Sequence, residues 1–140
     1  VRLFGFDPKV AFVSHSTFGQ PVTSRTKHIK KAVDILRDKK VDFEFDGDMQ
    51  PDVALNKDYR SLYPFSNIVG NANILIMPGQ HSAAISYKMM KELGDTKVIG
   101  PLLIGLGLPI EIAPLRTSTS ELINLASIAA YSADVIDYKK

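Results

Sequence analysis

The sequence contains no cysteine among its 140 residues. This absence excludes a disulfide framework and thiolate chemistry, and it fits a reducing compartment. Long apolar runs are also missing, since none reaches the roughly 18 residues that a membrane-spanning helix needs. No signal-peptide pattern is present either. We therefore expect a cytoplasmic protein that does not span a membrane.

Charge of one sign is scarce as well. The formal net charge is +2, and the longest basic runs are the pairs Lys30-Lys31 and Lys39-Lys40. Nucleic-acid-binding domains usually concentrate Lys and Arg in a patch or stripe, so we expect no nucleic acid as a partner. Hydrophobic residues make up 45% of the chain and charged residues 23%, which is ordinary for one globular domain.

Several common motifs of catalysis and binding are missing. The chain has no G-x-S-x-G elbow, and the neighbours Ser14 and His15 point to opposite faces of an extended segment, which disfavours a serine nucleophile. Gly105 and Gly107 lack the third glycine of a dinucleotide-binding loop. The carboxylates of Asp46–Asp52 do not have EF-hand spacing. A turn followed by a helix N-cap at Asp52 explains these acids better than a metal site, so we expect no metal here.

Strand-like and helix-like segments alternate along the chain, as judged from short apolar runs and from apolar residues at helical spacing. The predicted strands are Lys9–Ser14, Val41–Phe45, Ala72–Met77, Val98–Leu106 and Pro109–Ala113. The predicted helices are Ser24–Lys39, Val53–Leu62, Ser82–Leu93 and Ser120–Ile136. This alternation predicts a three-layer α/β/α fold with a mostly parallel sheet.

Ligands of parallel α/β sheets bind beyond the carboxyl ends of the strands. The sequence therefore predicts that the loops following the strands form the rims of one cleft. These loops are Ser14–Gln20, Asp46–Asp52, Pro78–Ser82 and Arg116–Ser120.

The first residues look like the end of an element rather than its beginning. Val1–Phe6 has the pattern of a last helical turn with Gly5 as its stop. We therefore expect this chain to be a fragment of a longer protein.

The polar turn Arg116–Glu121 opens the last predicted helix and is the strongest candidate site. A helix N-terminus carries unpaired N–H groups and the positive end of the helix dipole. Arg116 adds a fixed cation, and hydroxyl groups come from Thr117, Ser118, Thr119 and Ser120. Such a combination is typical of a phosphate or carboxylate site. An alternative stays open, because Ser118 and Glu121 also fit a capping box, which stabilises a helix start without any ligand.

Six segments carry a family resemblance and occur in the family's order. They are KVAFVSHSTFG, DGDMQPDVALN, YPFSNIVGNANILIMPG, AISYKMMKELG, VIGPLLIGLGLPI and ELINLASIAA. Together they cover nearly all of the chain, which resembles the phosphotransacetylase (phosphate acetyl/butyryl transferase) family. The resemblance is closest to the phosphotransacetylase-like domain at the C-terminus of large bacterial NADP-dependent malic enzymes.

This resemblance implies a larger parent with two α/β subdomains of the isocitrate dehydrogenase type. Residues 1–140 would be the C-terminal portion of the phosphotransacetylase-like domain, with the second subdomain and the terminal helix. The domain would form a homodimer or a higher oligomer. In a malic enzyme it would be regulatory and would bind acetyl-CoA. NADP and a divalent metal would belong to an N-terminal part outside this chain.

The family's catalytic pattern is altered here. Phosphotransacetylases carry a Ser-Arg pair before the last helix and, several residues later, an Asp that deprotonates the coenzyme A thiol. In this chain Glu121 takes the place of that Asp, Pro114-Leu115 takes the place of the pair, and Arg116 follows one residue late. A misplacement of about 1 Å is enough to impair catalysis, so we expect no catalytic residue, with Glu121 as an eroded candidate. The residues expected to bind the acyl-CoA are Arg116, Thr117, Ser118 and Ser120.

Two alternatives to the regulatory domain remain. One is a phosphate acetyltransferase, which moves acetyl between coenzyme A and phosphate. The other is a purely structural dimerisation module, which would bind no acyl-CoA.

Overall fold

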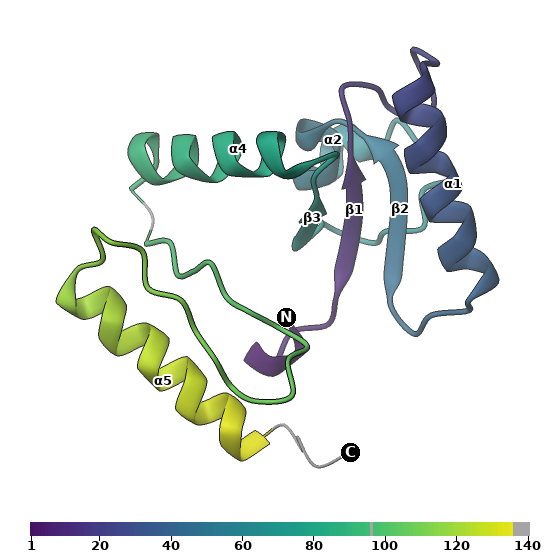
Figure 1. The fold of residues 1–140 in the computed structure, drawn as a ribbon. Coiled ribbons are helices and arrows are strands. Elements are labelled where there is room, and N and C mark those ends of the chain that lie inside the picture. Colours follow the sequence, from purple (N-terminus) through teal and green to yellow (C-terminus); the bar gives the residue numbers. More distant parts are fainter. Residues whose placement is uncertain (96, 136–140) are drawn as a thin grey trace. The chain divides into compact units, whose positions relative to one another are not determined.

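The computed structural model of this protein describes residues 1–95 and 97–135 (Figure 1). The chain divides into two compact units, which are unit 1, Val1–Lys88, and unit 2, Met89–Lys140. In the described part of the chain, no helix combines the length and the apolar character that crossing a membrane requires.

A three-stranded parallel sheet forms the centre of unit 1 (Figure 1). Its order is β2-β1-β3, with β1 at Lys9–Val13, β2 at Glu44–Met49 and β3 at Ile74–Ile76. The central strand β1 pairs in parallel with both neighbours. Because parallel neighbours need crossover connections, a helix runs between β1 and β2. The predicted α/β fold with a parallel sheet is confirmed.

The helices agree with the predicted ones except between β2 and β3. Their bounds are α1 Ser24–Asp38, α2 Pro51–Leu55, α3 Lys57–Arg60, α4 Gln80–Leu93 and α5 Thr119–Val135. The predicted end of the last helix at Ile136 lies outside the described residues. Near the N-terminus, Arg2–Phe4 forms a 3₁₀ helix, which Gly5 ends with a φ of 79°, as the glycine predicted.

The single helix predicted over Val53–Leu62 is wrong. Asn56 interrupts it with an extended conformation (φ −125°, ψ 112°), and its side chain accepts a hydrogen bond from the Asp58 N–H at 2.9 Å. An asparagine that caps the next helix therefore splits the segment into α2 and α3. Arg60 stabilises the break, because its buried guanidinium donates to the carbonyl oxygens of Val53 and Ala54.

Strand β2 begins later than predicted and extends into the predicted loop. The sequence predicts a strand over Val41–Phe45, whereas pairing with β1 starts at Glu44 and continues to Met49. The error arises because Asp46 and Asp48 look like loop residues, although both are buried within the strand. Buried carboxylates are tolerated where hydrogen bonds satisfy them.

The core of unit 1 lies where β1, the end of β2 and α2 meet. Its buried hydrophobic cluster consists of Ala11, Met49, Val53, Ala54, Ile68 and Ala72. Phe18, from the loop after β1, packs against this cluster; its ring contacts Tyr63 in a tilted arrangement and Phe65 edge-on, at centroid distances of 5.3 and 4.8 Å. Aromatic packing thus holds the loop after β1 in place.

In unit 2, the two predicted strands Val98–Leu106 and Pro109–Ala113 are wrong, because neither described segment forms a strand. Pro101 has no N–H to donate to a sheet. Gly100 and Gly105 take φ values of 129° and 85°, which depart from the extended conformation. The apolar pattern suggested buried strands, yet the backbone of this segment is unsuited to a continuous strand and most of its large apolar side chains are exposed.

Gly47 lies opposite Phe12, where β1 and β2 approach closely. A Cβ at this position would lie 2.7 Å from both the Cβ and the carbonyl oxygen of Phe12. The φ of Gly47 is 151°, which residues with side chains rarely adopt. Any side chain at this position would therefore push the two strands apart.

We predict that Gly47→Ala destabilises the chain by about 2 kcal/mol or more, because it combines a steric overlap with an unfavourable φ. Chemical denaturation measures the difference. Gly107→Ala is the matched control, since a Cβ there meets nothing within 4 Å and no positive φ is required; it should change stability by no more than about 0.5 kcal/mol. Equal effects of the two substitutions would contradict the close approach at Gly47.

Candidate functional site

The sequence predicts that four loops form the rim of one cleft. Three of these loops contribute residues to a cavity at the carboxyl edge of the sheet in unit 1. This cavity, of about 530 Å³, is lined by residues of Ser14–Gln20 and of Pro78–Ser82, and by Pro51 from Asp46–Asp52. The fourth loop, Arg116–Ser120, belongs to unit 2. The prediction that ligand-sized space lies beyond the strand ends is therefore confirmed for unit 1.

Two further residues line this cavity that the sequence analysis did not single out. They are Arg25 and His28, which lie one turn apart on α1. Residues three positions apart share a face of a helix. The sequence does contain a signal for them, because two basic residues three positions apart follow directly after a predicted strand and its loop.

Ser14 and His15, also at this cavity, do not form a nucleophile and base. The Ser14 hydroxyl is buried and lies 3.3 Å from the hydroxyl of Ser16, whose own proton goes to Asp48. Since a hydroxyl has one proton to donate, Ser14 donates to Ser16. The prediction that these neighbours make no catalytic pair agrees with this geometry.

The two aspartates of β2 are used as internal hydrogen-bond acceptors. Asp48 accepts from the Ser16 hydroxyl and, at 3.0 Å, from the backbone N–H of Gly19. Asp46 accepts from the Arg37 guanidinium at 3.2 Å and from the backbone N–H of Asn67 at 2.8 Å. Each carboxylate therefore ties β2 to another segment of unit 1.

These contacts give the acidic segment a structural role, although Asp46 and Asp48 lie in β2 and not in the predicted turn. Among the described residues, no group of three or more His, Cys, Asp or Glu side chains is placed to hold a metal ion. The predicted N-cap at Asp52 is wrong, because α2 begins two residues earlier than predicted, at Pro51, with Gln50 as its N-cap. Proline is favoured at the first helical position, since its fixed φ suits the helix and its missing N–H is not needed there.

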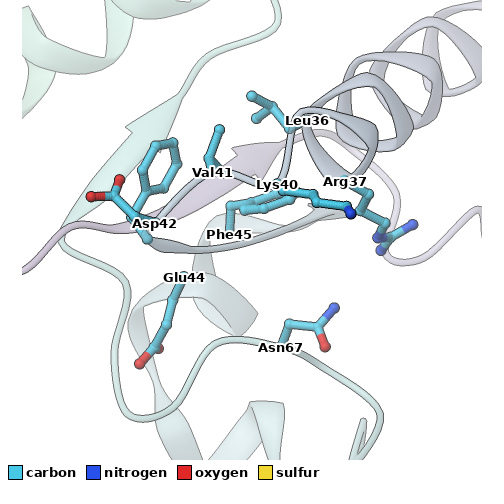
Figure 2. A pocket seen from close by; sticks show the side chains of 9 residues that line it. Leu36, Arg37, Lys40, Val41, Asp42, Glu44, Phe45 and Asn67 are labelled. Carbon is cyan, nitrogen blue, oxygen red and sulfur yellow. The ribbon is translucent and has the colours of Figure 1, made fainter.

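A second hollow of unit 1, of about 690 Å³, lies between the end of α1 and the start of β2. Figure 2 shows Asp42 and Glu44 at one end of this hollow and Lys40 and Arg37 at the other. Arg37 is already paired, since its guanidinium contacts both Asp34 and Asp46. Mixed and paired charges of this kind favour neither an anion nor a cation.

The Arg116–Glu121 turn in unit 2 contains the capping box that the sequence left open. The Glu121 carboxylate accepts from the backbone N–H and the hydroxyl of Ser118 at 2.7 and 2.9 Å, and the Glu121 N–H donates back to the Ser118 hydroxyl at 3.3 Å. The box satisfies groups at the start of α5 from within the chain.

Glu121 makes one further contact, an ion pair of 3.0 Å with Lys91 on α4. The hydrogen bond from the Ser118 backbone, followed by those from Lys91 and from the Ser118 hydroxyl, lowers the pKa of Glu121 from 4.5 to about 2. Donors that stabilise the charged form make a carboxylate a weak base. Glu121 is therefore an anchor of the helix start.

The other residues of the turn differ in how many hydrogen bonds their side chains make within the chain. The Thr117 hydroxyl and N–H both donate to the carbonyl oxygen of Pro114. The Ser120 hydroxyl lies 3.3 Å from that of Ser118. Arg116 is exposed, and no acidic group among the described residues of unit 2 pairs with it. The structure therefore leaves a fixed positive charge beside the start of a seventeen-residue helix.

Residues 1–130 match the sequence model of the family described as phosphate acetyl/butaryl transferase. The chain belongs to this family. The fold agrees, since EutD phosphotransacetylase from Staphylococcus aureus matches the structure with a TM-score of 0.86 and 31% sequence identity. That match covers 94% of this chain and 42% of the other.

Curated relatives of this phosphate acetyl/butaryl transferase family member include malic enzymes and phosphate acetyltransferases. The NADP-dependent malic enzyme of Rhizobium meliloti is 50% identical over 132 residues, which are 94% of this chain and 17% of that protein. The phosphate acetyltransferase of Clostridium acetobutylicum is 32% identical over 133 residues, which are 94% of this chain and 40% of that protein. The chain thus spans less than half the length of either relative.

We predict that Glu121 contributes stability that depends on pH. Its pKa is lower in the folded state, so the contribution is fully present above 4.5 and is lost as the pH falls toward about 2. Denaturation at about pH 6 should find Glu121→Gln less stable than the parent sequence, and at about pH 2 the difference should vanish. Glu92→Gln, on the exposed face of α4, is the control. A difference that persists unchanged at low pH would contradict the capping role.

Proposed function

We propose that this chain is the acyl-CoA-binding, non-catalytic domain of a cytoplasmic NADP-dependent malic enzyme. The observation that carries the proposal is its 50% identity to the malic enzyme of Rhizobium meliloti, against 32% to the phosphate acetyltransferase of Clostridium acetobutylicum. The parent reaction is the oxidative decarboxylation of malate to pyruvate. Its NADP and divalent metal would be bound by the rest of the parent, because the chain spans only 17% of that relative.

The contacts of Glu121 support the absence of acetyl transfer. A base that deprotonates a thiol needs a free lone pair and a pKa near the working pH. Glu121 instead accepts hydrogen bonds from Ser118 and Lys91, and its pKa is about 2. A carboxylate held this way has little tendency to take a proton from coenzyme A, whose thiol is far less acidic.

Arg116 supports the binding of acyl-CoA. Coenzyme A carries phosphate groups, and guanidinium is the side-chain group best matched to phosphate. Arg116 is exposed and stands one residue before the helix-opening hydroxyls of Thr117 and Ser118. The proposed contact set is Arg116, Thr117, Ser118 and Ser120.

Exposed apolar side chains in unit 2 support assembly into a homodimer. Ile104 is 82% exposed and Leu108 66%, and on α5 Ile123 is 60% exposed. Soluble monomers rarely leave many large apolar side chains open to water together. We infer that these residues are covered in the parent protein by its other parts or by a second copy.

We predict that the full-length protein binds acetyl-CoA without forming acetyl phosphate when phosphate is added. Arg116→Ala should weaken binding about tenfold or more, since charge-assisted hydrogen bonds contribute roughly 1.5–3 kcal/mol. Calorimetric titration measures the affinity, and a hydroxamate assay detects acetyl phosphate. Lys97→Ala removes an exposed cation of the same unit that is outside the proposed contact set, and it should leave the affinity unchanged.

The same experiment separates the proposal from its alternatives. Formation of acetyl phosphate would identify a phosphate acetyltransferase and reject the non-catalytic role. No binding and no turnover would leave a purely structural module. Binding that survives Arg116→Ala would keep the acyl-CoA function but would reject the Arg116 turn as its site.

A further inference from the structure

The cavity of about 530 Å³ at the carboxyl edge of the sheet collects basic side chains from separate elements. His15 comes from the loop after β1, and Arg25 and His28 come from α1. None of the described residues that line the cavity is acidic. The other two hollows of unit 1 described here differ, because Asp42 and Glu44 line one and the Asp46–Asp48 segment lines the other.

The basic side chains at this cavity are also unengaged. Elsewhere in unit 1, Arg2, Lys9 and Arg37 are each paired with a carboxylate. Within the described part of the chain, the side chains of Arg25, His15 and His28 have no hydrogen bond or ion pair. The fixed charge of Arg25 raises the local concentration of anions at this cavity, because no carboxylate among the described residues pairs with it.

The start of α4 adds to this positive potential. Pro78, just before the helix, and Ser82, in its first turn, both line the cavity. A fourteen-residue helix directs unpaired N–H groups and a partial positive charge at its first turn. An anion in this cavity would therefore meet donors from α4 as well as from Arg25 and the two imidazoles, each of which has an N–H to donate.

Part of the cavity wall is apolar. Val13, Ile29 and Met77 contribute aliphatic and thioether surface next to the basic group. A free phosphate ion needs no such wall and would occupy a small part of the volume. Pockets of this size that combine an apolar lining with a few charged groups are typical of small organic ligands.

We propose that this cavity binds a phosphomonoester of a small organic molecule, with the phosphate at Arg25, His28 and His15 and the organic part against Val13, Ile29 and Met77. The inference stands apart from the proposed function, because every lining residue lies in unit 1 and none belongs to the Arg116 turn. Arginine recognises phosphate through paired N–H donors, so Arg25 is expected to make the main contacts with the phosphate.

Calorimetric titration of the full-length protein with phenyl phosphate tests this proposal, since that probe has both a phosphomonoester and an apolar body. Arg25→Gln should weaken binding about tenfold. Lys30→Gln is the matched control, because it removes the same charge from the same helix but lines a different hollow. Equal weakening by both substitutions, or no measurable binding by the parent protein, would overturn the site.

Two further probes test the chemical class and its source. Orthophosphate should bind at least about fivefold more weakly than phenyl phosphate, because it lacks the apolar contact. Equal affinity of the two probes would contradict the proposal that the ligand is a phosphomonoester with an organic part. Coenzyme A carries one phosphomonoester, which dephospho-coenzyme A lacks. Displacement of phenyl phosphate by the former alone would identify coenzyme A as the source, and displacement by neither would identify a separate phosphorylated metabolite. Displacement by both equally would contradict recognition of the phosphomonoester.

Discussion

Two buried carboxylates of β2 hold the segments of unit 1 together. Asp48 binds the Ser16 hydroxyl and the Gly19 N–H, and it thereby fastens the loop after β1 to the end of β2. Asp46 binds Arg37 of α1 and the Asn67 backbone. Since a buried charge without partners is strongly unfavourable, these segments are constrained to stay together. The cavity beside them depends on this constraint, because His15 and Ser14 belong to the loop that Asp48 fixes.

Much of unit 1 could be predicted from the sequence, because its elements follow simple periodic patterns. The strand at Lys9 and the helices starting near Ser24 and Gln80 are close to their predicted positions. The errors occur where contacts between residues far apart in the sequence determine the local structure. Asp46 and Asp48 look polar and loop-like, and only their partners on other segments make a buried strand possible. The segment 98–113 is apolar enough for strands, but its glycine and proline backbone does not form them.

In the candidate sites, too, local features could be predicted from the sequence and long-range contacts could not. The capping box at Ser118 and Glu121 is readable from the spacing alone, whereas the ion pair with Lys91 joins residues thirty positions apart. Family membership followed from the order of six motifs, because such combinations constrain much more than composition does. Arg25 and His28 were missed, since two basic residues on a helix surface are usually only solvated. Their significance comes from the cavity that β1, α1 and the start of α4 enclose.

We propose that this domain binds acyl-CoA and thereby regulates a malate-oxidising enzyme. Linkage requires that a regulatory ligand changes the catalytic reaction over the same concentrations at which it binds. The most direct measurement is the rate of NADPH formation from malate by the full-length protein as acetyl-CoA is added. The account predicts a saturable change in rate whose midpoint matches the measured Kd. A malate oxidation rate that does not respond to saturating acetyl-CoA would contradict it.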